Sequence, residues 1–215
     1  KIVHNSFLGL EMTERTGTTC TFELVSEPAD QKFDAMLRRV FLIIKEMIGI
    51  LRRDTLVGKY TSREEIIFLK QQHDKFVWYC LRTLTSEWYS PRALPTWEIV
   101  RLLWIINHEL FYTYEYLYTK KAKIGDAAAA TLGDLETHFG HLYDGYYSRD
   151  IKHWFAIFEK NKVQQQNCHA ALERAKGAEA VFYSYLREHF RLIFMAMSPV
   201  VTLIMHDKIG KEYVV

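Results

Sequence analysis

The sequence predicts a mainly α-helical protein, in which a short β-hairpin precedes six long helices. Only 4 Pro and 10 Gly interrupt the 215 residues. Apolar residues recur at steps of three and four over long stretches, which is the spacing of one face of a helix. Residues 9–25 differ, because two short alternating runs flank Gly17, the pattern of a β-hairpin.

The six helices are placed by this apolar period and by the residues that interrupt it. The predicted ranges are 33–51, 61–88, 97–121, 125–147, 150–172 and 179–205. The expected N-terminal caps are Thr61 or Ser62, Thr96, Asp126 and Asp150. Gly177 supplies the break before the last helix, which Pro199 should kink.

The stretch HELFYTYEYLY, residues 108–118, places a tyrosine at every second position and so imitates a β-strand. The preceding residues already set a helical phase, and apolar positions such as Leu103, Leu110 and Leu117 continue it through the stretch. No Gly or Pro interrupts that phase before Gly125. We therefore expect a helix, with its tyrosines divided between the core and the margin.

Short connections between the helices favour antiparallel neighbours, and six such helices suit two tandem three-helix bundles. The predicted division is a linker and hairpin over 1–28, a first bundle over 29–124, a second over 125–207 and a tail over 208–215. The weak boundary between the bundles lies near Gly125.

Composition narrows the function classes. The chain has 28 basic and 26 acidic side chains, a balance too even to indicate nucleic-acid binding by charge alone. The three cysteines form no CxxC pair, which disfavours a structural zinc site or a redox motif. Their odd number, without a signal peptide, predicts reduced thiols in the cytoplasm. No signal peptide opens the chain, and the most apolar run, 192–205, is short and contains a proline, so we expect no membrane insertion.

Several segments resemble the archaeal PhoU-like regulators. The segment GLEMTERTGTTCTFELV leads into a first helix with the pattern Leu-Arg-Arg-hydrophobic, here residues 37–41. The second helix contains DKFVWYCLR, residues 74–82, where such proteins carry an acidic or amide residue followed by aromatics and Leu-Arg. Arg101 in EIVRLL matches an arginine of the third helix. The similarity covers essentially the whole chain and is stronger in the first half.

The resemblance implies two three-helix bundles and a role in phosphate uptake or a related response through protein contacts. The implied partners are a phosphate-transporter ATPase subunit or a sensor kinase. Many archaeal relatives also carry a swapped-hairpin DNA-binding domain ahead of the helices. Because this sequence starts at Lys1 and not at Met, a transcriptional regulator whose DNA-binding domain lies upstream is one alternative function.

The family often binds metal through acidic pairs spaced by four residues, which place two carboxylates on one helix face. The corresponding positions here are Lys70 and Asp74 on the second helix and His108 and Tyr112 on the third. In the last helix the acid is expected near Ser198 and Pro199, beside Met195 and Met197. Asp74 and His108 are thus the remaining candidate metal ligands, and we expect no cofactor, although a metal ion stays possible.

Histidines offer a second alternative, a di-metal helical-bundle oxidoreductase. Asp134, His138 and His141 share one helix face, and Asp150 and His153 repeat an acid-x-x-His spacing. A bundle site needs matching ligands from other helices. The side chains that offer themselves are His108, Glu109, Glu115 and His189, without a repeated pattern.

Arginines and aromatic residues point to an interaction protein. The candidate contact residues are Arg38, Arg39, Arg82 and Arg101. The 13 Tyr, 13 Phe and 5 Trp suit core packing or an interface between copies, so a homo-oligomer is expected. The sequence contains no GxSxG, P-loop, GxGxxG or HExxH motif. We therefore expect a non-enzymatic regulatory or interaction module.

Overall fold

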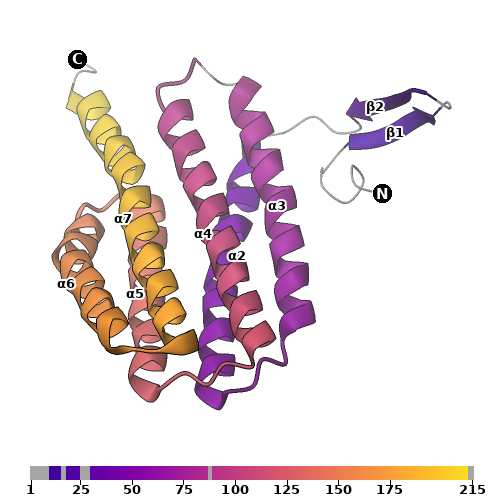
Figure 1. Ribbon diagram of the computed structural model, residues 1–215. Helices are drawn as coiled ribbons and strands as arrows, with labels where there is room; N and C mark the ends of the chain where they lie inside the picture. Colours follow the sequence, from indigo (N-terminus) through magenta and orange to yellow (C-terminus); the bar gives the residue numbers. More distant parts are fainter. Residues whose placement is uncertain (1–9, 16–17, 25–29, 87–88, 213–215) are drawn as a thin grey trace.

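The computed structural model describes residues 10–15, 18–24, 30–86 and 89–212. The predicted hairpin is confirmed: β1 (Leu10–Arg15) pairs antiparallel with β2 (Cys20–Leu24), with an irregularity between Met12 and Glu14. The expected turn residue Gly17 lies outside the described residues. Among the described residues the two strands contact each other and no helix, so the hairpin stands beside the bundle (Figure 1).

Six helices follow the hairpin in the described part of the chain, as the apolar period predicted (Figure 1). They are α2 (Asp30–Val57), α3 (Arg63–Ser86), α4 (Ala93–Lys120), α5 (Asp126–Ser148), α6 (Lys152–Arg174) and α7 (Gly177–Glu212). Consecutive helices run antiparallel, because each connection is only a few residues long.

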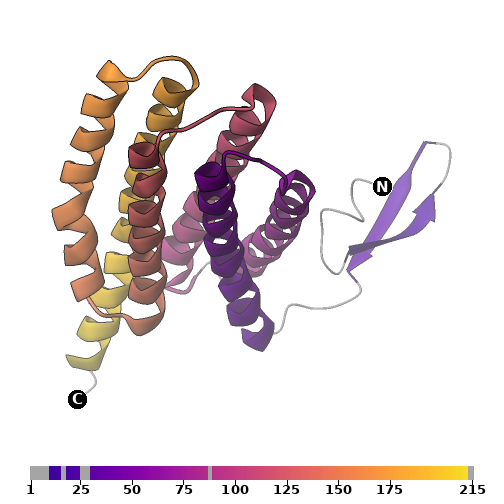
Figure 2. The ribbon, with the colours of Figure 1, turned by 90° about the horizontal axis from the view of Figure 1, so that it is seen from below.

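The helices group three and three, but the two groups share a large contact. Helices α2, α3 and α4 contact one another, as do α5, α6 and α7. The groups meet where α2 packs on α5 and α4 packs on α7, and the second of these is the most extensive helix–helix contact of the molecule. Seen from below, α3 lies at one edge of the bundle and α6 at the opposite edge, with α2, α4, α5 and α7 between them (Figure 2).

One apolar core runs through both groups. Its joint between α2 and α5 is aromatic, because Phe41 lies 5.4 to 6.0 Å, between ring centroids, from four rings of α5. These rings belong to Phe139, Tyr143, Tyr146 and Tyr147. Aromatic contacts of this kind contribute beyond the area that they bury, by about 1 kcal/mol each. The predicted boundary near Gly125 therefore marks a turn of the chain and not the end of a core.

The tyrosine-rich stretch is helical, as expected. Tyr114 is fully buried, Tyr116 is half-buried, and Tyr112 and Tyr118 are 53% and 42% exposed. Their positions follow the rotation of about 100° per residue of a helix, so alternate residues do not share a face. This distribution between core and margin is the one that the helical phase predicts.

Three predicted caps were misplaced by one or more residues. Thr96 lies inside α4, which starts at Ala93, and its hydroxyl donates to the carbonyl of Arg92 at 2.7 Å. Asp126 is the first residue of α5, so that Gly125 takes the cap position. Asp150 lies before Ile151, the residue that precedes α6, and its carboxylate accepts the amide of Lys152. Pro95 is tolerated in the first turn of α4, where its missing N–H costs nothing.

The last helix is longer than predicted. It passes through Pro199 and continues to Glu212, beyond the predicted end at residue 205. Pro199 removes one backbone hydrogen bond, but its side chain is buried, and so are Val200, Leu203 and Ile204 beyond it. Packing of these residues offsets the lost bond. By length and composition, α7 is the one helix of the described residues that is apolar enough to cross a membrane, and 56% of its most apolar stretch is buried in the bundle.

Candidate functional site

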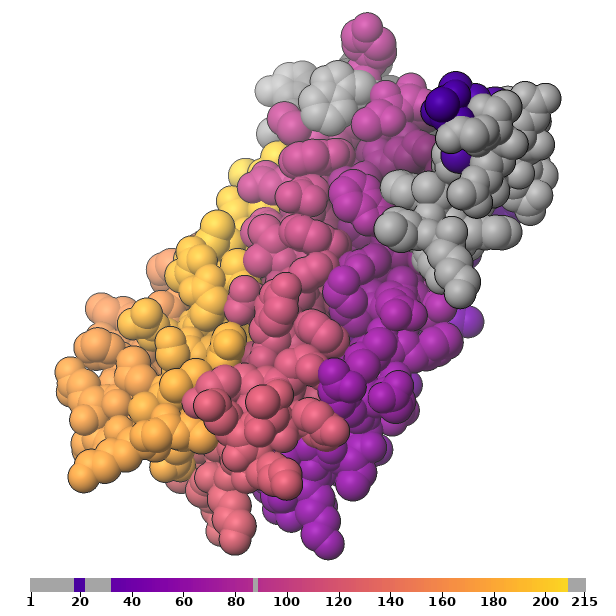
Figure 3. All heavy atoms as spheres, turned by 45° about the vertical axis from the view of Figure 1, so that its right-hand side comes forward, coloured from indigo at the N-terminus to yellow at the C-terminus, as the bar shows by residue number. Residues whose placement is uncertain are grey.

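The structure divides the predicted site residues between two surfaces. Those between α3 and α4 are Asp74, Arg82, Arg101 and His108, and those on the outer side of α2 are Arg38 and Arg39. Figure 3 shows α3 and α4 side by side on one face of the molecule, with α7 next to α4. The hairpin lies off one end of this face (Figure 1).

The candidate metal ligands Asp74 and His108 are engaged by other groups. Nζ of Lys70 lies 2.6 Å from Oδ2 of Asp74, so the lysine neutralises the carboxylate from the position where the family pattern has an acid. Nδ1 of His108 lies 3.1 Å from the carbonyl oxygen of Trp104, and therefore carries the ring proton. Burial lowers the pKa of His108, and Lys70 and Arg101 add to this. The arrangement suits an ion pair beside a neutral imidazole.

His73 lies next to this pair and was missed in the sequence. It is fully buried, and neither ring nitrogen has a hydrogen-bond partner in the described structure. Burial lowers its pKa to about 3, and the charges of His108 and Lys70 act in the same direction. Its place on the apolar face of α3, four residues before Val77, was a usable signal.

The last helix presents sulfur and carbon where the family pattern expects an acid. Met197 and Pro199 are buried, whereas Met195 and Ser198 are exposed. The methyl carbon of Met197 packs against Gly145 of α5, where an added Cβ would lie 3.2 Å from it. A thioether in this place fills the contact between α5 and α7 by packing.

The histidines of the di-metal alternative each contact one other ring and do not form a cluster. His141 and His153 face each other with their Nδ1 atoms 3.3 Å apart, and the His138 ring lies 5.0 Å from that of Phe190. No group of three or more His, Cys, Asp or Glu side chains in the described ranges is arranged to hold a metal ion. The set Asp134, His138 and His141, with Asp150 and His153, therefore does not converge as the di-metal alternative requires.

His189 joins the two groups of helices through Thr113. The Thr113 hydroxyl donates to the carbonyl of Glu109 at 2.7 Å, so it can only accept at its contact with Nε2 of His189, 3.0 Å away. The proton of this imidazole therefore sits on Nε2. His189 is 1% exposed, and burial lowers its pKa to about 4. This residue is a structural hydrogen-bond donor between α7 and α4.

Cations line the outer side of α2 at intervals of seven residues. The Arg38 guanidinium lies 4.7 Å from the ring centroid of Tyr147, and the Lys45 ammonium lies 5.5 Å from that of Tyr143. Arg52 forms an exposed 3.0 Å ion pair with Glu136. Heptad spacing aligns the three cations along the seam with α5.

The exposed side of α2 also carries apolar residues between its cations. Leu42 and Leu56 are 41% and 55% exposed. They lie between this row of cations and a second row, which contains Arg39 and Arg53. We call this surface the α2 basic face, and its residues are Arg38, Arg39, Leu42, Lys45, Glu46, Arg52, Arg53 and Leu56. Arg52 pairs with Glu136, and Arg53 pairs with Asp54 and Glu65, so the excess positive charge of the face comes mainly from Arg38, Arg39 and Lys45.

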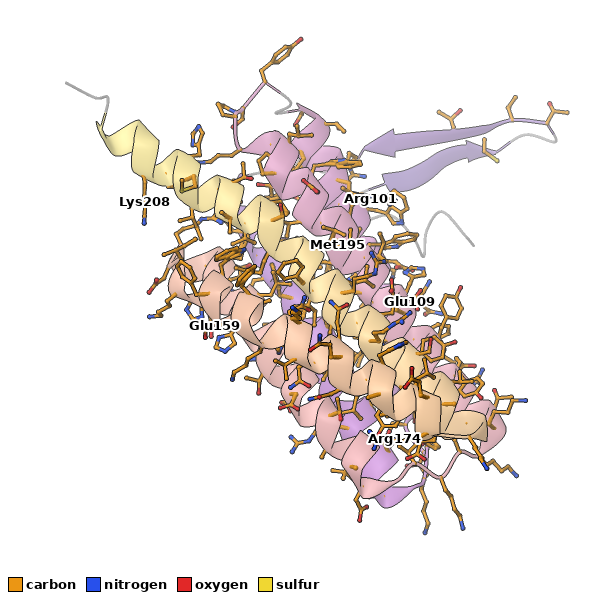
Figure 4. All side chains as sticks on the ribbon, turned by 60° about the vertical axis from the view of Figure 1, so that its left-hand side comes forward. Arg101, Glu109, Glu159, Arg174, Met195 and Lys208 are labelled. Carbon is orange, nitrogen blue, oxygen red and sulfur yellow. The ribbon has the colours of Figure 1, made fainter. Side chains whose placement is uncertain are left out.

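A groove of about 530 Å³ lies between α3 and α4. We call it the tryptophan groove, and its residues are Trp78, Leu81, Arg82, Thr85, Trp97 and Arg101. The Arg101 guanidinium lies 4.8 Å from the ring centroid of Trp104 and 5.9 Å from that of Trp97. Trp97, Arg101 and Trp104 are spaced by four and three residues, a pattern that was readable in the sequence. Figure 4 labels Arg101 on α4.

A second hollow, of about 670 Å³, lies where the ends of α4, α5 and α7 meet. Asp207 pairs there with both Arg92 and Arg149. The aspartate bridges the two guanidiniums, and we read it as a tie between the helix ends.

Comparison of the chain with protein-family models, with curated proteins and with solved structures finds no match.

Proposed function

We propose that this chain is a PhoU-like helical module that regulates phosphate uptake, or a related phosphate response, through protein contacts in the cytoplasm. Three features support the proposal: six helices arranged three and three, the segments that resemble the family, and exposed surfaces of mixed apolar and cationic character. The α2 basic face carries the argument, because it presents charge and apolar area together.

The α2 basic face suits an acidic, amphipathic protein segment. Arg38, Arg39 and Lys45 outnumber the single Glu46 among the residues of the face that are not ion-paired elsewhere, and this excess favours an anionic partner. Leu42 and Leu56 lie among them, and exposed leucines contribute to binding only against apolar side chains. A nucleic-acid backbone offers phosphates but no such side chains, so a protein partner fits the face better.

The partners that the resemblance suggests are a phosphate-transporter ATPase subunit or a sensor kinase. An acidic helix of either would lie along α2, with its carboxylates over Arg38, Arg39 and Lys45. Self-association is a separate part of the proposal. It is supported by the exposed aromatic residues Phe155 and Phe158 on α6, which are 50% and 52% exposed.

The two alternative functions make different demands. A di-metal oxidoreductase needs converging ligands, and the described residues contain no such group. A transcriptional regulator needs a DNA-binding domain ahead of residue 1, which the full-length coding sequence decides. Among the three, regulation by protein contact uses features that the described surface already presents.

The test compares alleles in the native host for uptake of radiolabelled phosphate under phosphate-replete growth. A deletion should change uptake severalfold, and the double variant Arg38→Glu/Arg39→Glu should reproduce most of that change. Lys123→Glu/Lys176→Glu, at exposed positions between helices and away from both proposed contact surfaces, is the matched control, because it alters charge by the same amount. It should behave as the unmodified protein, and circular dichroism confirms that both variants fold.

Two results would contradict the proposal at different points. Unchanged phosphate uptake in the deletion strain removes the phosphate role. A strong deletion effect that the α2 variant does not reproduce keeps the role but moves the contact elsewhere.

A further inference from the structure

The tryptophan groove combines flat apolar walls with a cation. Trp78 and Leu81 line it from α3, and Trp97 lines it from α4. Leu81 is 7% exposed, whereas the Trp78 side chain is 37% exposed. Indole faces favour flat apolar molecules in offset or edge contacts. The walls therefore favour a ring system or another planar body.

Arg101 supplies a charge that no carboxylate of the described ranges neutralises within ion-pair distance. Its guanidinium is held by the rings of Trp104 and Trp97, at 4.8 and 5.9 Å. A guanidinium that is held near aromatic faces still carries five N–H donors, and it offers them in pairs to carboxylate, phosphate or sulfonate. Arg82 lies on the facing helix and also lines the groove.

We propose that the tryptophan groove binds a small organic anion, with its flat apolar body against Trp78 and Trp97 and its anionic group on Arg101. The groove's volume of about 530 Å³ lies within the range of small-ligand sites, roughly 300–1,000 Å³. The charge of Arg101 favours an anion. Inorganic phosphate alone would leave the apolar walls uncovered, so the favoured ligand also has an apolar part.

The site is independent of the α2 basic face. The two surfaces lie on different helices, and the groove involves α3 and α4 only. An anion bound in the groove would contact α3 and α4 but not α5, so its direct effect would be limited to the first group of helices. Failure of the proposed phosphate role leaves this inference standing, and the reverse also holds.

The experiment uses two fluorescent probes that differ in charge. 1-Anilinonaphthalene-8-sulfonate has a flat apolar body and a sulfonate, and N-phenyl-1-naphthylamine has the same body without the charge. Both are titrated into the whole chain, and the sulfonate should bind saturably at one site. Arg101→Gln should weaken the sulfonate about tenfold, the loss of one charge-assisted pair, and change the neutral probe less than twofold. Arg101→Lys should restore part of the difference.

Trp97→Leu should weaken both probes, because it removes a wall. Trp154→Leu is the matched control, since Trp154 lines another hollow with Phe194 and Met195, and it should leave both affinities unchanged. Thermal unfolding of every variant confirms its fold.

The inference is overturned if the sulfonate probe does not saturate, or if its affinity survives both Arg101→Gln and Trp97→Leu. It is also overturned if Trp154→Leu abolishes binding, which would place the probe in the other hollow. Equal losses of both probes in Arg101→Gln would deny that the arginine holds the anionic group.

Discussion

The hydroxyl of Tyr114 donates a 2.6 Å hydrogen bond to Oδ2 of Asp54, sixty residues earlier in the chain. Asp54 is 3% exposed and also accepts the Ser62 amide at 3.2 Å and the Arg53 guanidinium at 3.3 Å. Burial raises the pKa of Asp54, but the hydrogen bonds outweigh it and hold the pKa below its ordinary value. One buried carboxylate thus ties the end of α2 to the start of α3 and to the middle of α4.

Removing this hydroxyl should destabilise the protein. Tyr114→Phe leaves a buried carboxylate without one donor, which we expect to lower the free energy of unfolding by about 2 kcal/mol. Tyr112→Phe on the same helix is the control, because Tyr112 is 53% exposed and its hydroxyl meets water. Urea denaturation followed by circular dichroism measures both. Equal stabilities for the two variants would show that the bond contributes nothing.

The buried histidines should make the protein sensitive to mild acid. Burial holds the pKa of His73 at about 3 and those of His138 and His189 at about 4, below the ordinary value of 6.5. Below pH 6.5 the unfolded chain takes up protons that the native state refuses, so stability falls as the pH drops toward 4. Each histidine contributes a slope of up to about 1.4 kcal/mol per pH unit.

Urea denaturation between pH 7.5 and 4.5 measures this slope. His189→Leu should lower the slope by up to about 1.4 kcal/mol per pH unit, the contribution of one proton. His169→Gln, at an exposed position of α6, should leave the slope unchanged. A stability that stays constant from pH 6.5 to 4.5 would mean that these imidazoles titrate normally.

The contact between Thr113 and His189 should couple the two groups of helices. Thr113→Val keeps the shape but leaves the buried Nε2 proton of His189 without an acceptor, at a cost of about 1–3 kcal/mol. Thr137→Val is the control, because its hydroxyl is exposed and bonds within its own helix. A double-mutant cycle of Thr113→Val with His189→Leu isolates the pair, and a coupling energy near zero would contradict it.

Two glycines of α5 should respond differently to alanine. Nothing lies within 4 Å of a Cβ added at Gly140, so Gly140→Ala should stabilise the helix by about 0.5–1 kcal/mol. A Cβ at Gly145 would lie 3.2 Å from Met197 and 3.3 Å from Cβ of His153. Gly145→Ala should therefore lose that gain or destabilise the protein. Thermal unfolding decides, and a stabilisation at both positions would mean that the α5–α7 contact is loose.

The cysteines should differ sharply in reactivity. Burial raises the pKa of the Cys168 thiol to about 11 and that of Cys80 further, whereas Cys20 is exposed. Since the thiolate is the reactive form, Ellman's reagent at pH 8 should titrate one thiol in the native protein. Denaturant should release all 3. Two or three fast thiols in the native state would show that the helices open readily.

The sequence predicted the elements well because their signals are local. Three- and four-residue spacing identified every helix of the described chain, and alternation identified the hairpin. Ends were less accurate. Thr96 resembles a cap, but its hydroxyl returns to Arg92 inside the helix, a bond that competes with capping and that spacing does not reveal. The continuation of α7 through Pro199 depended on neighbours that bury the proline.

The candidate site was harder to predict than the fold. Arg82 and Arg101 were expected as contact residues, and both line the tryptophan groove. Their tryptophan neighbours were counted only as part of an aromatic surplus. The histidine sets shared helix faces in the sequence, yet His138 packs against a phenylalanine and His141 meets His153. A shared face brings side chains to one side of a helix, but ligation requires convergence from several helices.

By itself the sequence determined that this chain forms helices, roughly where they lie and which stripe of α2 and of α4 is buried, because a period of 3.6 residues is a property of neighbouring residues. Only the tertiary structure decided that Asp54 receives Tyr114, that His189 donates to Thr113 and that Arg101 lies over tryptophans. Those partners are set by how the helices pack. Residues that are far apart in the chain show no regular spacing that would predict their contact.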